Sequence, residues 1–273
     1  MCELFAMSSL HPATVSFSLE EFAQHGGVTG PHKDGWGIAF YEGMDIKLIR
    51  ESGSAGASPY IDFIKEHSHT SRIVISHIRL ATLGDNSLHN SQPFSRELGG
   101  RMHVFAHNGD LPGIFDPDRF PTGHFCPIGD TDSEHAFCHL LNRMQQLWLC
   151  SKPPTIEERY RIVASFASSI RPLGPANFIY SDGEYLFAHG HKRTQAKTES
   201  IRPPGLHLLH RTCMPGRSGS KISGLELEYC GQPQEVVLIA SVPLTDEAWE
   251  PFEEGEILVL KSGTIFKGNW NCD

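Results

Sequence analysis

The chain begins Met1-Cys2-Glu3-Leu4-Phe5, and the cysteine directly behind the initiator methionine is its most informative residue. Removal of Met1 would leave one residue that carries both a thiol and a free α-amine. A thiol is a weak nucleophile until a base takes its proton, and an amine with an ordinary pKa of about 7.7–8.0 can be that base. Cys2 is therefore either a nucleophile that brings its own general base or an incidental thiol, and the rest of the sequence has to decide.

Length and composition limit the classes of protein to consider. The 273 residues are 39% hydrophobic and 20% charged, as in an ordinary globular protein, and the net charge of −9 argues against general nucleic-acid binding. No apolar run approaches the roughly 20 residues that a bilayer span requires, and we expect no secretory leader. No long linker interrupts the sequence. We therefore expect one cytoplasmic domain over residues 1–273, with neither nucleic acid nor a membrane as its partner.

The cysteines and histidines bear on redox state and metal binding. The cysteines are odd in number and form no CxxC pair, which favours reduced thiols. They are Cys2, Cys126, Cys138, Cys150, Cys213, Cys230 and Cys272. His135 and His139 would share one helix face, but the zinc-protease pattern needs Glu directly after the first His, and here Glu134 precedes it. We expect no metal and no other cofactor.

Hydrophobic patterns predict strands and hairpins interleaved with a few helices. The predicted strands cover residues 36–41, 45–50, 72–78, 102–107, 177–180, 185–189, 206–209, 236–241 and 256–261. Predicted helices begin at Ser58-Pro59, Thr131 and Thr155, and extend to about residues 67, 148 and 170. Residues 89–100 are rich in turn formers and receive no ordered element. The locally basic residues 191–221 are either a solvated loop or a surface for an acidic partner.

Three loop motifs accompany Cys2, each at a strand end. Asp34-Gly35-Trp36-Gly37 is either a turn into a strand or a tight passage beneath a substrate. The run from His77 to Thr82, HIRLAT, places Arg79 after an apolar strand, where its guanidinium needs a carboxylate from the protein or from a substrate. Ala106-His107-Asn108-Gly109 is either an ordinary hairpin signal or a pair of adjacent donors such as an oxyanion hole requires.

A fourth motif, Thr131-Asp132-Ser133-Glu134, places carboxylates at a predicted helix start. Asp132 can cap the helix there, or it can hold a cationic group of a substrate.

In this order, the motifs around Cys2, Trp36, Arg79, Asn108 and Asp132 resemble those of the class II glutamine amidotransferases, and most closely their stand-alone YafJ-like type. The resemblance continues at Ala240–Glu247 and so covers nearly the whole chain. It implies an α+β fold, the four-layer α-β-β-α sandwich of the N-terminal-nucleophile hydrolases.

The resemblance also implies a role for each motif residue. Cys2 would attack the γ-amide of glutamine or of a γ-glutamyl compound, with its α-amine as the base. Asn108 and Gly109 would stabilise the oxyanion. Arg79 would bind the substrate α-carboxylate and Asp132 its α-ammonium, with Thr82 lining the same pocket. Hydrolysis of the resulting thioester would release glutamate, and either ammonia or an amine.

The remaining alternatives concern the fate of the leaving group. Synthases of this class join the glutaminase to a second domain that consumes the ammonia, and this sequence has no room for one. The chain is therefore expected to be a simple hydrolase, or else a low-activity glutaminase or regulatory subunit that delivers ammonia to a separate synthase partner.

Overall fold

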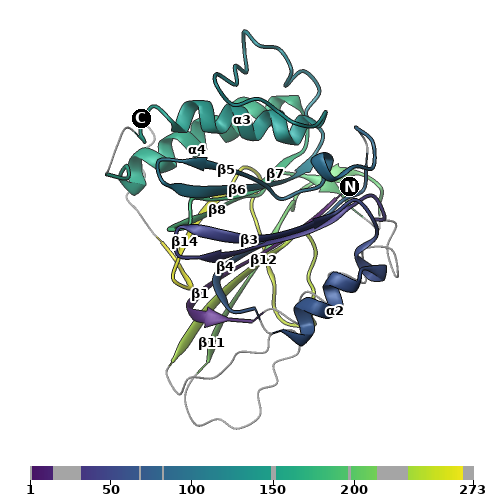
Figure 1. Ribbon diagram of the computed structural model, residues 1–273, viewed down its shortest axis with the longest axis vertical. Coiled ribbons are helices and arrows are strands. Elements are labelled where there is room, and N and C mark those ends of the chain that lie inside the picture. The colour runs from purple at the N-terminus through teal and green to yellow at the C-terminus, as the bar shows by residue number, and fades with distance from the viewer. Residues whose placement is uncertain are drawn as a thin grey trace.

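Two antiparallel sheets packed face to face form the body of the protein (Figure 1). The computed structural model describes residues 2–14, 32–67, 69–81, 83–148, 152–195, 198–213 and 233–266. Within these residues, no helix is both long enough and apolar enough to cross a membrane.

The first sheet has seven strands in the order β13-β11-β12-β1-β4-β2-β3. Their bounds are β1 (Glu3–Ala13), β2 (Trp36–Glu42), β3 (Asp45–Glu51), β4 (Ser71–Ile78), β11 (His207–Cys213), β12 (Gln234–Ala240) and β13 (Glu250–Pro251). β1 lies between β12 and β4 and pairs antiparallel with both. The strand that follows Cys2 is therefore a central one.

The second sheet has six strands in the order β15-β14-β8-β7-β6-β5. Their bounds are β5 (Phe94–Leu98), β6 (Arg101–Gly109), β7 (Ala176–Ser181), β8 (Leu186–His189), β14 (Ile257–Lys261) and β15 (Thr264–Ile265). A separate two-stranded sheet joins β9 (Arg193–Thr194) to β10 (Ile201–Arg202).

The helices cover the outer faces of the sheets (Figure 1). α3 (Asp132–Met144) and α4 (Ile156–Ile170) pack on the six-stranded sheet, and α2 (Pro59–Glu66) packs on the seven-stranded sheet. Three short 3-10 helices connect other elements: η1 (Ala55–Ala57), η2 (Leu88–Asn90) and η3 (Arg171–Leu173). The core accordingly falls into one cluster between the sheets and one beneath each helical face.

Local capping explains where the helices begin. Ser58 accepts a hydrogen bond from Tyr60 N, with Pro59 as the first residue of α2. Thr155 and Glu158 form a complete capping box at α4. At α3, Thr131 accepts from Glu134 N, but the Glu134 carboxylate accepts from Gly129 N instead of closing the box.

Most of the predicted elements are confirmed, and the differences have local causes. α3 ends at Met144, four residues before the predicted end, and residues 145–147 form turns. The unassigned stretch 89–100 contains β5, whose partner β6 supplies the hydrogen bonds that its turn-rich sequence did not indicate. β1 had no prediction because both of its faces are buried, which removes the alternation that marks a half-buried strand.

In the basic stretch 191–221, part of the chain lies outside the described residues. Arg193 and Arg211 are buried and hydrogen-bonded to Ser241 O and to Glu247 respectively. These two cations therefore do not belong to a surface for an acidic partner.

Candidate active site

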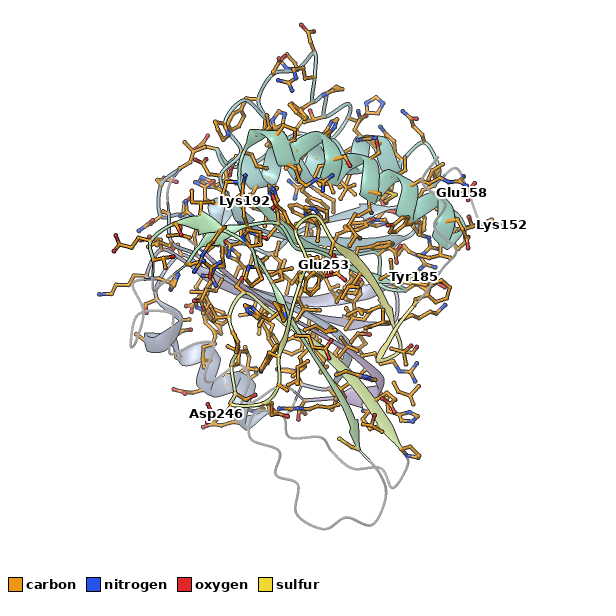
Figure 2. The ribbon with its side chains drawn as sticks, turned by 180° about the vertical axis from the view of Figure 1, so that it is seen from behind. Lys152, Glu158, Tyr185, Lys192, Asp246 and Glu253 are labelled. Atoms are coloured by element: carbon orange, nitrogen blue, oxygen red, sulfur yellow. The ribbon has the colours of Figure 1, made fainter. Side chains whose placement is uncertain are left out.

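The motif residues gather at one end of the two sheets because of strand register. Cys2 directly precedes β1, and Leu4 pairs with His77 near the end of β4. Gly37, at the start of β2, also pairs with His77, while Asn108 at the end of β6 pairs with Asn177 at the start of β7. Figure 2 shows Lys192, which follows β8, well to the left of Tyr185, which precedes it, and Asn177 Nδ2 donates to Lys192 O at 2.9 Å. The motif residues occupy the Lys192 end.

Cys2 lies on the inter-sheet side of β1. Side chains alternate along a strand, and Leu4 and Ala6 both belong to the core between the sheets, so Cys2 shares their side. Its thiol is half-buried, with Leu80 N 3.3 Å and Leu80 O 3.4 Å from Sγ. Burial raises the pKa of the Cys2 thiol above its ordinary value, partly opposed by the Leu80 hydrogen bond and the charge of Arg79. The thiol therefore needs a base to become a nucleophile at neutral pH.

Asn108 faces the same inter-sheet space from the opposite sheet. It shares its side of β6 with Val104 and Ala106, which belong to the core between the sheets. Its carboxamide nitrogen lies 3.2 Å from Ser241 Oγ, which also accepts a hydrogen bond from Leu4 N at 3.0 Å. The Asn108 side chain is thereby connected, through one hydroxyl, to the strand that carries Cys2.

Gly109 follows Asn108 in a space that admits no side chain. A Cβ atom there would lie 1.8 Å from Pro175 O and 2.8 Å from His107 Nε2. Close backbone approach is therefore the structural reason for glycine at this position.

Arg79 is buried where the chain leaves β4, and its guanidinium is surrounded by carbonyls. Nη1 donates to Asp34 O at 3.1 Å and Asp85 O at 2.8 Å. Nη2 donates to Leu83 O at 2.8 Å and Gly84 O at 3.1 Å. The predicted carboxylate partner from the protein is thus replaced by backbone oxygens, and Arg79 organises the segment 83–85.

Asp34 of the first glycine motif holds the same segment from its other side. One carboxylate oxygen accepts from Ala81 N at 2.8 Å and the other from Asn86 Nδ2 at 2.9 Å. Asp34 N and Arg79 O also hydrogen-bond, at 3.3 Å. The motif therefore fixes the chain on both sides of residue 82. Thr82, the remaining predicted pocket residue, lies outside the described residues.

Asp132 begins α3 and is buried close to these groups. Its Oδ2 accepts from Leu111 N at 2.8 Å, and its Oδ1 accepts from Ser133 N at 2.7 Å. The next residue, Ser133, has its Oγ 2.9 Å from His107 Nδ1, so the start of α3 contacts the strand that carries Asn108 and Gly109. The structure therefore brings together Cys2, Arg79, Asn108, Gly109 and Asp132.

Buried imidazoles line the space around the site. His107 faces α3, with Nδ1 2.9 Å from Ser133 Oγ, and its backbone N donates to Gln92 Oε1 at 2.6 Å. Burial lowers the pKa of His77 to about 3, so this imidazole is neutral at physiological pH. These residues shape the site without adding positive charge to it.

Sequence reasoning missed three polar residues at this end: Ser241, Asn177 and Arg193. Asn177 Nδ2 donates to Asn108 O at 3.0 Å, and Arg193 Nη1 donates to Ser241 O at 2.7 Å. Asn177 and Ser241 stand at ends of predicted strands, and Ser241 also lies in the Ala240–Glu247 part of the family resemblance, but neither signal assigned these residues a role. Contacts between strands that are far apart in sequence bring Asn177 and Ser241 against Asn108.

Two groups of side chains are of types that ligate metals, and members of both already make hydrogen bonds within the protein. His135 Nε2 and His139 Nδ1 interact with the carbonyls of Phe120 and Pro121, at 3.1 and 2.8 Å. Among the described residues, ligand atoms of Asp85, His89 and Asp130 lie within 4.8 Å of one another. In that group, the Asp85 carboxylate already accepts hydrogen bonds from Ser87 and Asn90.

Comparison with known proteins supports this reading of the motifs. The family model for class-II glutamine amidotransferases matches residues 1–271. The Escherichia coli (strain K12) protein named "Putative glutamine amidotransferase YafJ" is 36% identical over 260 residues, which are 94% of this chain and 96% of that protein.

Two solved structures are similar to this chain in fold. A crystal structure described as a predicted glutamine amidotransferase from Pseudomonas aeruginosa PA01 is 32% identical, with a TM-score of 0.68 over 98% of this chain and all of that one. The glutamine phosphoribosylpyrophosphate amidotransferase of B. subtilis shares the fold, with a TM-score of 0.59 at 17% identity, over all of this chain and 50% of that one. The chain belongs to the class-II glutamine amidotransferase family.

Proposed function

We propose that this protein hydrolyses the γ-amide of glutamine or of a γ-glutamyl compound, with Cys2 as an N-terminal nucleophile after removal of Met1. The observation that carries the proposal is the meeting of Cys2 with Asn108, Gly109, Arg79 and Asp132 at one end of the two sheets. The family membership supports the use of glutamine, and the reaction releases glutamate together with ammonia or an amine.

Cys2 carries out the attack on the substrate carbonyl. The raised pKa of its thiol means that a base must take the proton, and the α-amine of the same residue is in reach once Met1 is gone. The amine then returns the proton to the leaving nitrogen, and water hydrolyses the γ-glutamyl thioester. Asn108 Nδ2 and Gly109 N stabilise the oxyanion in both steps.

Arg79 and Asp132 select an amino-acid head group. Asp132 pairs with the α-ammonium. Its carboxylate accepts hydrogen bonds from two backbone N–H groups and one hydroxyl, and no ion pair with another described residue compensates its charge. Arg79 pairs with the α-carboxylate by exchanging one or more of the carbonyls of residues 83–85 for it. We propose Thr82, on the resemblance to the family motif, as a further substrate-binding residue. An amide without this head group would leave both charges unpaired.

The fold and setting are part of the proposal. The order of layers, with α2 outside one sheet and α3 and α4 outside the other, supports the four-layer α-β-β-α sandwich of the N-terminal-nucleophile hydrolases. We propose one domain over residues 1–273, supported by the family match over residues 1–271. The described cysteines are free thiols, which supports a reducing, cytoplasmic setting.

The test follows the intact mass of untagged protein and glutamate release from glutamine in one sample. We expect loss of Met1, glutamate formation, no turnover for Cys2→Ala and at most a trace for Cys2→Ser. Cys126→Ala is the matched control, because this exposed thiol lies outside the site and its loss leaves turnover unchanged. A retained N-terminal tag abolishes activity by acylating the proposed base.

Each outcome separates the alternatives. Turnover by Cys2→Ala, or by protein that keeps Met1, refutes the mechanism. Loss of Met1 without glutamate release from glutamine, but with release from a γ-glutamyl amine, assigns the second substrate class. Turnover that rises only when a co-purified synthase is added assigns the ammonia-delivering subunit.

A further inference from the structure

Ser241 is held against the strand of the nucleophile by both its backbone and its side chain. Its N–H donates to Leu4 O at 3.0 Å, and its hydroxyl oxygen accepts from Leu4 N at 3.0 Å. In a regular antiparallel ladder, Leu4 N would donate to the Ser241 carbonyl oxygen. Here that carbonyl oxygen accepts from Arg193 Nη1 at 2.7 Å instead. These contacts fix the Ser241 hydroxyl beside Leu4, which follows Cys2 by two residues in the chain.

The hydrogen bonds around this hydroxyl can be counted. A serine hydroxyl offers one donor and two acceptor sites, and Leu4 N occupies one acceptor site. With Asn108 Nδ2 as its other neighbour at 3.2 Å, the hydroxyl meets two donors, while Asn108 Oδ1 is buried without a hydrogen-bond partner among the described residues. One buried acceptor and one hydroxyl hydrogen are thus left over, which costs free energy.

A half-turn of the Asn108 carboxamide removes both defects. Oxygen and nitrogen of an amide occupy nearly the same space, so the exchange needs no other movement. The Ser241 hydroxyl then accepts from Leu4 N and donates to Asn108 Oδ1. The NH₂ group takes the position that had held the unpartnered oxygen.

We propose that Ser241 is a positioning residue that selects this orientation of Asn108 and so presents an NH₂ donor, rather than an acceptor, to the oxyanion. The inference rests on the proposed oxyanion role of Asn108. Asn177 Nδ2 fixes the Asn108 backbone through its carbonyl at 3.0 Å, so the direction of the carboxamide is what remains to be set. An acceptor at this position would repel the negative charge that develops on the substrate oxygen.

A double-mutant cycle in the full-length, Met1-processed enzyme tests the inference. We expect Ser241→Ala to lower kcat for glutamine about 10- to 100-fold, with KM within about twofold, because only transition-state stabilisation is lost. In an Asn108→Ala background, Ser241→Ala should change kcat by less than about twofold, since no carboxamide remains to orient. A merely structural role would lower kcat by the same factor in both backgrounds, and that result overturns the inference.

Two further variants serve as controls. Ser76→Ala removes another buried hydroxyl of the same sheet, which donates to Gly37 O at 2.9 Å, and should leave kcat unchanged. Ser241→Cys keeps the side-chain size but only a weak donor, so its kcat should lie below that of the wild type; it replaces Ser241→Ala in the cycle if that variant does not fold. A wild-type kcat for the folded variant at position 241 also overturns the inference.

The two proposals fail in different ways. If Asn108→Ala keeps the wild-type kcat, the oxyanion assignment and the Ser241 inference both fail. If Asn108→Ala loses activity while the cycle is additive, Ser241 alone loses its role and the proposed function stands.

Discussion

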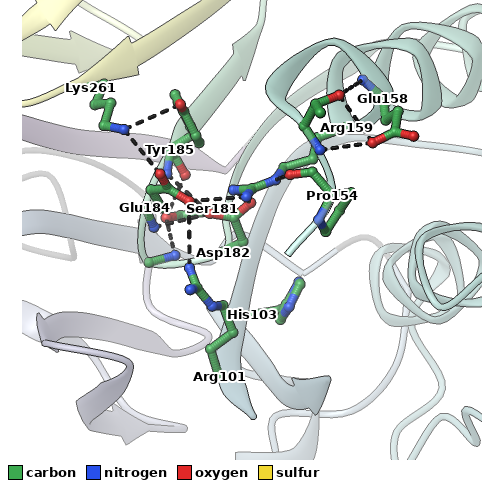
Figure 3. Close-up of polar contacts among 12 residues, drawn as sticks. Arg101, His103, Pro154, Glu158, Arg159, Ser181, Asp182, Glu184, Tyr185 and Lys261 are labelled. Atoms are coloured by element: carbon green, nitrogen blue, oxygen red, sulfur yellow. Dashed lines mark hydrogen bonds and ion pairs between the residues drawn. The ribbon is translucent and has the colours of Figure 1, made fainter. Parts of the chain in front are cut away.

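The two ends of the six-stranded sheet differ in how their buried polar groups are satisfied, although each has unpartnered atoms: Trp148 Nε1, beside Arg159, is buried without a hydrogen-bond partner among the described residues. At the β7–β8 turn, Arg159 donates to Pro154 O at 2.9 Å, Asp182 at 2.9 Å and Glu184 at 3.0 Å (Figure 3). Lys261 adds a second contact to Glu184 at 2.9 Å. We call these residues, Arg159, Asp182, Glu184 and Lys261, the arginine network. Each of its charges meets an opposite charge.

The Cys2 end leaves polar atoms without partners. Among the described residues, His107 Nε2, Asn108 Oδ1, His189 Nε2 and Arg193 Nε are buried and have no hydrogen-bond partner. Natural proteins satisfy almost all buried polar groups, so a concentration of exceptions calls for an explanation. The contrast supports two proposals: the arginine network contributes to stability, and the Cys2 end keeps donors and acceptors available for the proposed substrate.

The largest expected effect on catalysis comes from removing an unpartnered group at the Cys2 end. Asn108→Ala should lower kcat about 10²- to 10³-fold, because one oxyanion donor is lost. The melting temperature should change little, since the side chain has few hydrogen bonds to lose. Steady-state kinetics and thermal unfolding on the same preparation check both parts. A large fall in melting temperature with normal kcat would reverse the comparison.

Breaking the arginine network should give the opposite result. Arg159→Met leaves Asp182 buried without its partner, and we expect a loss of about 3–5 kcal/mol in the free energy of unfolding. The folded fraction should keep its kcat. Denaturant titration measures the free energy of unfolding, and kinetics normalised to the concentration of folded enzyme measure kcat. Arg143→Met is the control, because that arginine makes a surface hydrogen bond to Ser165 and should cost less than about 1 kcal/mol.

A charge change at Asp132 should alter substrate selection. Asp132→Asn keeps the size of the side chain but loses the charge that pairs with an α-ammonium, and its one amide oxygen can accept from only one of Leu111 N and Ser133 N. We expect kcat/KM for glutamine to fall about 10- to 100-fold, as for a lost charged hydrogen bond of about 1.5–3 kcal/mol. An amide without the α-ammonium, assayed in parallel, should be much less affected. Equal losses for the two substrates would contradict the assignment.

The smallest expected effect is on the pH dependence of stability. Burial lowers the pKa of His189 to about 3 and that of His103 to about 4, against about 6.5 in an unfolded chain. Between these values the unfolded chain binds more protons, so stability is complete above pH 6.5 and falls as the pH drops. We expect a loss on the order of 1 kcal/mol for each imidazole at pH 5.5.

Thermal unfolding of the wild type from pH 7.5 to 5.5 measures this loss, and His103→Gln and His189→Gln should each reduce the slope. Both ring nitrogens of His103 make hydrogen bonds, to Tyr180 and Leu98, whereas His189 makes one through Nδ1, to Ala176 O. A stability that rises on acidification would contradict the sign.

The sequence predicted the elements whose patterns are local. Two hairpins, the helix starts at Ser58, Thr131 and Thr155, and the family motifs could all be read from neighbouring residues. It did not predict β1 or β5. β1 is buried on both faces and lacks alternation, and β5 forms because β6 lies beside it.

The site divides in the same way. The sequence by itself determined which residues we propose for the chemistry, because the N-terminal cysteine, the arginine, the Asn-Gly pair and the acidic helix start are each a short motif with its own chemical character. Tertiary structure alone decided that Ser241 and Asn177 lie against Asn108, and that Arg79 faces backbone carbonyls. The physical reason is strand register: pairing of β1 with β4 and β12 brings together residues as distant in sequence as Leu4 and Ser241, 237 positions apart, and no local pattern encodes such a pairing.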